Sequence, residues 1–565
     1  MDIRGPLSEI VAAAVGECFP GKVPPQEALK AAIVEMPRDM AHGDMATSVC
    51  LKLARALKTA PLAAAKALEP AVKRACDARL PGYVESIEVV APGFMNFHLG
   101  LACLRGVLGE MAKGGYGRSD KGAGIRYNVE YVSGNPTGPL TVATGRQAAV
   151  GDSLCNILEY AGYGVAREYY VNDTGGQIRM LGASVFHYYA AEAGASYPFP
   201  EEGYHGDYIP DVAKELYAKE GKALLSLREA EAIERAGVFA SELILGIIRK
   251  DLADFRVRFD KWFSQKEFEA GGVVEDLVER FRKLGLAYES EGAVWLKASE
   301  FGDDKDRVLV KSDGVFTYRT PDIAYLENKF QRGADRAVLL VGPDHHGHVI
   351  TLQAAMRALG HAVDAFRGLI VQFCTLWRGK EKLKMSKRAA HYITLREVFE
   401  EVGIDATRYF FTARDTNSPL DFDLELAKKQ SMDNPVYYVQ YMSARLTGVL
   451  DTARGDGRFA EGFREGLYVD AGADLSALGA EEEPILRHLM QWPVVIEKAA
   501  ENLEPHRACG YLYELAGLFH NYYAKNRFVS EDTRLSRARL YFASALKVLL
   551  GEALGLIGVT APGKM

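Results

Sequence analysis

The chain has 565 residues, a length typical of three or four domains. Its apolar fraction of 48% and charged fraction of 25% are those of a soluble globular protein. No apolar run approaches the length of a membrane span, so we expect no membrane partner. The formal net charge of −7 counts against nucleic-acid binding through overall basic charge and favours an acidic enzyme without an RNA partner. Basic residues are nevertheless concentrated over 378–388.

The first segment, residues 1–118, is predicted to be an α+β domain. Its N-terminus carries Asp2 and Glu9 and apolar residues at helical spacing, which predicts an amphipathic helix rather than a signal peptide. Residues 84–99 alternate like two strands around a Pro-Gly turn, and a linker rich in Gly and charge spans 114–124. Seven cysteines without a CxxC pair indicate reduced thiols and a cytoplasmic protein.

The stretch 126–152 predicts a strand, a tight loop and a helix. Residues 126–132 have the β-branched and aromatic content of a buried strand. Residues 133–139 hold two prolines and two glycines, and a helix begins near Leu140 or Thr141. A strand that turns through such a loop into a helix N-terminus is the phosphate-binding corner of a doubly wound α/β fold. The chain has no GxGxxG and no Walker lysine, which argues against ordinary dinucleotide and P-loop proteins.

Strands and helices alternate through the rest of residues 119–395. Further strands are expected at 165–171, 314–319, 336–342 and 369–373, with helices between them. A block of about 180–305, which includes a helical stretch rich in Glu, Ala and Lys at about 210–256, is expected to be an insertion in this fold. The pattern predicts a doubly wound parallel sheet with ligands at the carboxyl ends of its strands.

Residues 396–565 lack that alternation and predict an all-α helical bundle. Helices are expected at 395–402, 406–413, 436–452, 484–503, 507–525 and 535–557. Tyr438 and Tyr441 lie three apart on one helical face, a spacing that is usually found in a core.

Several polar residues admit more than one interpretation from the sequence. Lys384 and Lys387 fit either a solvated basic face or a phosphate site on a mobile loop. The run 344–348 holds one aspartate and three histidines, so it fits a helix start capped by Asp344 or a metal site. Asp322 follows Pro321 and fits a helix cap.

The motifs together resemble those of the arginyl-tRNA synthetases, a class I aminoacyl-tRNA synthetase family. NPTGPLTVATGR (135–146) looks like the first class I signature, and KMSK stands intact at 384–387. Matching segments follow in the family's order along essentially the whole chain: NDTGGQI (172–178), GYHGDYI (203–209), FDKWFS (259–264), TPDIAY (320–325), PDHHGH (343–348), SPLDFDLELA (418–427) and DNPVYYVQYMSAR (433–445).

The resemblance implies an enzyme that joins arginine to its tRNA through an arginyl-adenylate, consuming ATP. ATP would enter with Mg²⁺ as a substrate complex, and no protein-held metal is expected. The partners would be tRNA, ATP and L-arginine, and we expect a monomer. The N-terminal domain would contact the tRNA elbow, and the helical domain would bind the anticodon.

The resemblance also assigns site residues, each at the position that matches the family's motif. The catalytic set is Thr141, Thr144, Lys384 and Lys387. The ATP set is Asn135, Pro136, Thr137, Gly138, Pro139, Ala143, Asp344, His345, His346, Met385 and Ser386. The arginine set is Glu130, Asn135, Tyr318 and Asp322, with Asp322 on the guanidinium, Tyr318 supporting it and Glu130 on the α-ammonium. The tRNA set is Phe94, Asn96, Tyr438, Tyr441 and Met565. Phe94 and Asn96 also fit a core ring and a satisfied edge amide.

The first signature departs from the family pattern. The family has His-Val-Gly-His where this chain has Thr141, Val142, Ala143 and Thr144. Hydroxyls remain, but they are shorter and neutral, and Ala143 adds a methyl group where a ligand should come close. Three hypotheses follow: an arginyl-tRNA synthetase of reduced or re-engineered activity, an inactive relative that still binds tRNA, and an adenylate-forming ligase with another acceptor. The intact KMSK and arginine positions favour the first.

Overall fold

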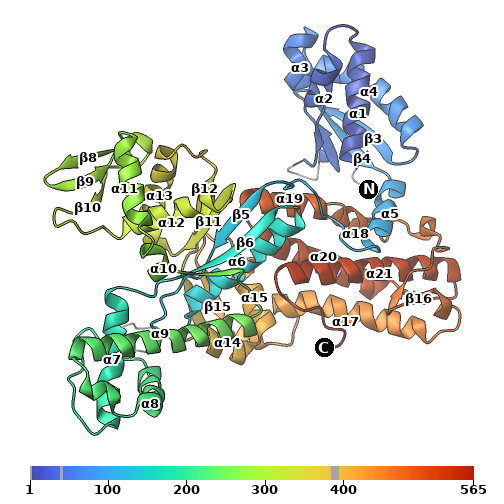
Figure 1. The fold of residues 1–565 in the computed structure, drawn as a ribbon. Coiled ribbons are helices and arrows are strands. Elements are labelled where there is room, and N and C mark those ends of the chain that lie inside the picture. The colour runs from blue at the N-terminus through green and yellow to red at the C-terminus, as the bar shows by residue number, and fades with distance from the viewer. Residues whose placement is uncertain (1–2, 38–41, 384–392) are drawn as a thin grey trace.

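A five-stranded parallel sheet lies at the centre of the chain (Figure 1). The structure, a computed structural model, describes residues 3–37, 42–383 and 393–565. The strand order is β12-β11-β5-β6-β7, and every neighbouring pair is parallel. These strands are β5 (Arg126–Glu130), β6 (Gly164–Val171), β7 (Lys261–Ser264), β11 (Arg336–Val341) and β12 (Phe366–Ile370). The doubly wound parallel sheet predicted from the sequence is confirmed.

The chain leaves β5 first toward β6 and β7, and later returns on the other side to β11 and β12. The direction of winding therefore reverses between β5 and β11. In open α/β sheets the crevice at such a reversal, beyond the carboxyl ends of the strands, is where ligands bind. The loops that follow β5 and β11 meet at this crevice.

Two excursions leave the sheet, one on each side of β7 along the chain. The first, α7 (Gly176–Glu192), α8 (Tyr208–Glu220) and α9 (Glu229–Asp254), projects at the lower left of Figure 1. The second holds α10 (Gln265–Glu269), α11 (Val273–Lys283), β8 (Ala287–Ser290), β9 (Ala293–Leu296), β10 (Arg307–Val310) and α12 (Arg319–Gln331). The block of about 180–305 is thus interrupted by β7, a strand of the central sheet.

The strand expected at 314–319 is not formed. Strand β10 ends at Val310, and α12 begins at Arg319. The hydroxyl of Thr317 donates to the carbonyl of Val308 (2.8 Å), and that of Thr320 donates to the carbonyl of Leu309 (2.7 Å). These two side chains donate hydrogen bonds to backbone carbonyls of β10, and the chain then turns into a helix. As a result Tyr318 lies at a helix N-terminus.

The N-terminal unit is an antiparallel sheet packed with helices. The sheet order is β1-β2-β4-β3, and the apolar face of α1 (Leu7, Ile10, Val11, Ala14 and Val15) is buried. Its elements are α1 (Arg4–Cys18), α2 (Pro25–Ala31), β1 (Val34–Glu35), β2 (Met45–Thr47), α3 (Val49–Leu57), α4 (Pro61–Arg79), β3 (Val84–Val90), β4 (Phe94–Leu99) and α5 (Leu101–Met111).

Helices dominate after the sheet, as expected, but a small three-stranded sheet includes one strand, β15, from among them. Strand β15 (Leu420–Asp423) pairs in parallel with β13 (Cys374–Arg378), which also pairs with β14 (Glu381–Lys382). The remaining elements of this region are α13 (His346–Ala358), α14 (Leu395–Val402), α15 (Ile404–Ala413), α16 (Leu424–Lys428), α17 (Pro435–Arg454), β16 (Phe463–Arg464), β17 (Leu467–Tyr468), α18 (Glu483–Leu489), α19 (Trp492–Asn502), α20 (His506–Lys525) and α21 (Thr533–Leu556). None of the helices in the described ranges could span a membrane.

Candidate active site

The corner after β5 is a loop that is fixed by hydrogen bonds with side chains from neighbouring elements. Val132 and Ser133 have positive φ values of 69° and 40°, which turn the chain sharply away from the strand. The Tyr169 hydroxyl donates to the carbonyl of Gly134 at 2.7 Å. The Asn135 amide donates to Gln177 of α7 at 2.6 Å, so the first excursion supports this loop.

A second tyrosine fixes the tip of the same loop. The hydroxyl of Tyr208, on α8, donates to the carbonyl of Thr137. A Cβ on Gly138 would lie 2.8 Å from that hydroxyl, so the close approach requires glycine. Pro136 is buried, whereas Thr137, Gly138 and Pro139 are partly exposed toward the helix N-terminus. The Gly/Pro loop predicted from the sequence is therefore a corner braced from outside the sheet.

Helix α6 (Val142–Tyr160) starts from this corner with Thr141 as its N-cap residue. The Thr141 hydroxyl accepts from the backbone N–H of Thr144 (3.5 Å), and the Thr144 hydroxyl donates to the Thr141 carbonyl (2.8 Å). The two hydroxyl oxygens are 3.4 Å apart. Ala143 is exposed beside them. The threonines thus serve the helix end itself, while the free N–H groups of the first turn point at the crevice.

The chain that leaves residues 384–392 is attached to the same corner. The backbone N–H of Leu395 donates to the carbonyl of Leu140 (2.8 Å), and Thr394 forms a bridge with Thr141. Lys384, Met385, Ser386 and Lys387 lie outside the described residues. The described residues that flank them are β14 on one side and Thr394, bridged to Thr141 at the N-terminus of α6, on the other.

Arg146, one turn further along α6, binds the backbone that leads toward this segment. It is completely buried, and its guanidinium donates to the carbonyls of Gln372 (2.8 Å), Asp415 (3.0 Å) and Ser418 (3.1 Å). Gln372 lies between β12 and β13, and the other two lie between α15 and β15. One side chain therefore fixes the phosphate corner relative to two strand connections. Nothing in the sequence indicates this role beyond the arginine's place in the first signature.

The loop after β11 presents a short run of exposed polar side chains at the crevice. Asp344, His345 and His346 are exposed at the junction of a 3₁₀ turn and α13. The N-cap residue of α13 is His345 and no side chain caps it, so Asp344 is not the cap that its sequence suggests. Among the described residues no group of three or more His, Cys, Asp or Glu side chains is arranged to hold a metal ion.

Tyr318, Asp322 and His348 come together between α12 and α13. Tyr318 is 64% exposed, and its ring centroid lies 5.8 Å from that of His348. The His348 Nε2 atom lies 3.1 Å from Oδ2 of Asp322. No side chain caps α12, so the capping role considered for Asp322 is wrong. Sequence reasoning missed His348, because its place on the face of α13 that meets α12 could not be read from the run of histidines.

Glu130, at the carboxyl end of β5, belongs to a network of buried charged side chains. Its carboxylate accepts from Lys329 on α12 (2.6 Å) and from the Ser133 hydroxyl (2.9 Å). The next carboxylate in this network, Glu168 on β6, accepts from Arg332 (2.6 and 2.8 Å) and from Tyr325. Helix α12 thus carries Asp322 at the crevice and also Lys329 and Tyr325, which contact the buried carboxylates of β5 and β6.

The Tyr170 hydroxyl is a feature that sequence reasoning missed. It is buried and has no hydrogen-bond partner among the described residues. Burial raises the pKa of Tyr170, and the negative charges of Asp322, Glu130, Glu269 and Asp173 raise it further. Carboxylates from α12, β5, α10 and the loop after β6 therefore act on the Tyr170 hydroxyl near the carboxyl end of β6.

The residues matched to tRNA contacts lie on two other parts of the molecule. Phe94 and Asn96 share one face of β4, where Phe94 is 38% exposed and Asn96 only 4%. The Asn96 side chain is therefore mostly covered. That face continues through His98 to a seam between the N-terminal unit and the bundle.

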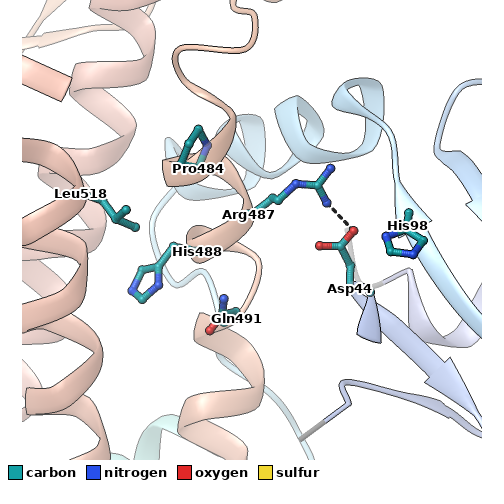
Figure 2. Close-up of a pocket in the computed structure, with 8 residues that line it drawn as sticks. Asp44, His98, Pro484, Arg487, His488, Gln491 and Leu518 are labelled. Carbon is teal, nitrogen blue, oxygen red and sulfur yellow. Dashed lines mark hydrogen bonds and ion pairs between the residues drawn. The ribbon is translucent and has the colours of Figure 1, made fainter. Parts of the chain in front are cut away.

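A cavity of about 320 Å³ lies at this seam (Figure 2). The N-terminal unit and α18 meet there, and Arg487 of α18 pairs with Asp44. The lining residues are Gly43, Asp44, His98, Pro484, Arg487, His488, Gln491 and Leu518.

On the bundle, Tyr438 and Tyr441 are half-buried on α17 and belong to a larger aromatic surface. The ring of Tyr438 lies 5.1 Å from that of Tyr513 on α20, and Tyr441 stacks on Tyr437 at 5.6 Å. Tyr513 is 46% exposed and was not found from the sequence, because it comes from a helix 75 residues away from Tyr438. Met565 is 50% exposed at the chain end.

A doubly wound parallel sheet whose winding reverses beside β5, joined to a helical bundle, is the architecture of a class I aminoacyl-tRNA synthetase. Family models for the class I (R) catalytic domain, the DALR anticodon-binding domain and the arginyl tRNA synthetase N-terminal domain match residues 116–432, 439–565 and 6–99. The chain belongs to the arginyl-tRNA synthetase family, as its sequence motifs predicted.

Curated relatives and solved structures agree with this assignment. The arginine–tRNA ligase of Desulforamulus reducens is 42% identical over 94% of this chain and 93% of its own length. That of Syntrophotalea carbinolica is 40% identical over 99% of both chains. The arginyl-tRNA synthetase of Thermus thermophilus, at 21% identity, shares the fold over the full length of both chains with a TM-score of 0.74.

Proposed function

We propose that this chain attaches L-arginine to its tRNA through an arginyl-adenylate. The observation that carries the proposal is the Asp322 carboxylate, which is 36% exposed and has no ion pair with lysine or arginine among the described residues. A guanidinium requires planar, charged acceptors, and the adenylate chemistry requires the arginine carboxylate to reach a phosphate at the helix N-terminus. One crevice offers both.

The reaction has two steps. The arginine carboxylate attacks the α-phosphorus of ATP, which enters with Mg²⁺, and pyrophosphate leaves. The terminal ribose hydroxyl of tRNA then attacks the adenylate carbonyl, and AMP leaves. We assign Asp322 to the guanidinium, supported by Tyr318, and Glu130 and Asn135 to the α-ammonium and substrate backbone.

Phosphate charge that develops in the first step needs fixed donors. The first turn of α6 supplies backbone N–H groups, and Asn135, Pro136, Thr137, Gly138, Pro139 and Ala143 shape the corner around ATP. Asp344, His345 and His346 line it from β11. Lys384 and Lys387, with Met385 and Ser386, act from the segment that ends beside Thr141. The bridge between Thr394 and Thr141 supports this assignment.

Thr141 and Thr144 replace two donors that this family uses, so we infer attenuated turnover. Loss of one donor to a developing charge costs about 10²–10³ in rate.

For tRNA, residues 1–118 contact the elbow through Phe94 and Asn96, and residues 396–565 contact the anticodon through Tyr438, Tyr441 and Met565. Residues 119–395 activate arginine, and the protein acts as a cytoplasmic monomer.

ATP–pyrophosphate exchange with arginine, measured with and without tRNA, tests this function. We expect exchange that depends on arginine, followed by charging of the tRNA. Binding of tRNA without exchange would identify an inactive relative. Exchange without any charging would identify a ligase with another acceptor.

A further inference from the structure

The side chain of His348 contacts Asp322, the carboxylate proposed to bind the guanidinium of arginine. It lies on the first turn of α13, with Nε2 3.1 Å from Oδ2 of Asp322. The His348 side chain is 13% exposed and that of Asp322 is 36% exposed. The imidazole therefore forms the inner wall of the pocket, while the carboxylate remains open to a ligand.

The other ring nitrogen of His348 suggests which proton it carries. Nδ1 is buried and has no hydrogen-bond partner among the described residues. A proton on Nδ1 would be a buried donor without an acceptor, which is costly, whereas Nε2 lies 3.1 Å from a carboxylate oxygen. The neutral tautomer with the proton on Nε2 fits this setting, and it leaves the negative charge of Asp322 available.

Helix α12 provides an internal comparison. Glu327, five residues after Asp322 on α12, accepts from Nε2 of His361 (2.6 Å) and from Nη1 of Arg280 (2.5 Å). Its charge is therefore matched by an arginine of the protein. Asp322 has no ion pair with lysine or arginine in the part of the chain that the structure describes. A histidine–carboxylate contact that lacks its own guanidinium is suited to receive one from a ligand.

We propose that His348 is a positioning residue for arginine recognition: it holds the Asp322 carboxylate toward the substrate guanidinium. The ring of Tyr318, centred 5.8 Å from the imidazole, flanks the pair on the exposed side. This inference rests on the proposed function, because it assumes that Asp322 receives the guanidinium. Without the imidazole, the carboxylate would be free to rotate and would have to be ordered when arginine binds.

Direct binding of L-arginine to the full chain tests the proposal without depending on the rate of adenylation. Isothermal titration calorimetry gives Kd for wild type, Asp322→Asn, His348→Ala, His348→Gln and the double variant Asp322→Asn/His348→Ala. We expect His348→Ala to raise Kd about tenfold, the loss of one charge-assisted contact. His348→Gln keeps a donor at the position of Nε2 and should restore Kd to within about threefold of wild type.

His361→Ala is the matched control, because it removes a histidine contact to Glu327, which lies on the same helix as Asp322. It should lower the thermal unfolding midpoint but leave the Kd for arginine unchanged. In the Asp322→Asn background, His348→Ala should add less than about twofold, because the two residues act through one contact. In steady-state charging, KM for arginine should rise while kcat and KM for ATP change little.

The outcomes separate this inference from the function on which it rests. If Asp322→Asn leaves Kd unchanged, the assigned arginine pocket is wrong, and the role of His348 falls with it. If Asp322→Asn weakens binding and His348→Ala stays within twofold of wild type, the pocket stands and the positioning role is wrong. An effect of His348→Ala that is undiminished beside Asp322→Asn would equally overturn it.

Discussion

At the scale of single residues, the two threonines of the first signature serve the helix rather than the crevice. The Thr144 hydroxyl donates to the Thr141 carbonyl at 2.8 Å, and Thr141 accepts from the backbone N–H of Thr144. Both side chains are thus engaged with the end of α6. A histidine at either position would reach further and could carry a donor to a phosphate oxygen.

We therefore predict that Thr141→His/Thr144→His raises the rate of arginine-dependent ATP–pyrophosphate exchange at least tenfold. The physical reason is the gain of donors aimed at charge that develops in the transition state, each worth about 10²–10³ in rate at an optimal position. The measurement is kcat for exchange at saturating arginine and ATP.

Thr452→His is the control for this prediction. Thr452 is exposed on α17, and its hydroxyl donates to a helix carbonyl at 2.8 Å, as Thr144 does. It lies far from the corner along the chain, so exchange should not change. An equal rate in the Thr141→His/Thr144→His variant and wild type would show that these positions do not contact the phosphates.

At the scale of elements, helix α12 joins the arginine pocket to buried charges of the sheet. Burial alone would raise the pKa of Glu168, but hydrogen bonds from Arg332 and Tyr325 and the charge of Lys329 lower it from 4.5 to about 2. The folded state therefore binds fewer protons at Glu168 than the unfolded state does. Its contribution to stability is fully present above pH 4.5 and is lost as the pH falls toward 2.

We predict that this one carboxylate accounts for about 3 kcal/mol of the stability lost on acidification, since one pKa unit corresponds to about 1.4 kcal/mol. Glu168→Gln should destabilise the protein near neutral pH, because the buried Lys329 and the partly exposed Arg332 are left with a weaker partner. Between pH 5 and pH 3 its stability should then fall less steeply than that of wild type. Urea unfolding midpoints across this range measure both effects.

Glu289→Gln serves as the comparison in that experiment. Glu289 pairs with Arg282 at 3.2 Å, but its side chain is 74% exposed, so water screens the pair. Its stability profile should follow wild type at every pH. If the stability of Glu168→Gln also follows that of wild type at every pH, the stability of the charge network around Glu168 does not depend on the charge of this residue.

At the scale of the whole molecule, the sequence predicted the order of the three regions and the central corner, because local patterns encode them. Alternating apolar residues, Gly/Pro loops and helical periodicity are short-range signals. It did not predict the break between α18 and α19 within 484–503, although Pro493 in the first turn of α19 supplies the reason. It also missed β7, whose four residues join the sheet only by pairing with β6.

The candidate site residues also fall into those that short-range sequence signals could place and those that such signals could not. Residues within a contiguous motif, such as Asn135 and Gly138, could be placed at the corner from the sequence. His348, Tyr170 and Tyr513 could not, because each acquires its neighbours from an element far away along the chain. The contact that Asp44 makes with Arg487 of the bundle likewise joins elements far apart along the chain.

Asp44 and Arg487 connect the N-terminal unit to the bundle. The Asp44 carboxylate, in a residue 6% exposed, accepts from the backbone N–H of Leu99 (2.7 Å) and from Arg487. The same guanidinium donates to the carbonyl of Leu99 at 3.1 Å. Removing Arg487 would leave a buried carboxylate without its cation, which costs about 3 kcal/mol or more.

We predict that Arg487→Ala loosens the N-terminal unit and weakens tRNA binding several-fold, while the Kd for arginine stays the same. The reason is that the surfaces proposed to contact the tRNA elbow and the anticodon would no longer be held at a fixed separation. Filter binding gives the Kd for tRNA, calorimetry gives the Kd for arginine, and the radius of gyration from small-angle scattering should increase.

Arg534→Ala provides the matched control, since Arg534 pairs with Asp474 at 2.7 Å on the exposed surface within the bundle. It removes the same kind of ion pair without crossing the seam, so tRNA affinity and radius of gyration should both stay at the wild-type value. An Arg487→Ala variant with unchanged dimensions but weaker tRNA binding would mean that Arg487 contacts the tRNA itself. Unchanged dimensions and unchanged affinity would mean that other contacts, such as the pair of Arg4 with Glu497 at 2.9 Å, hold the unit in place.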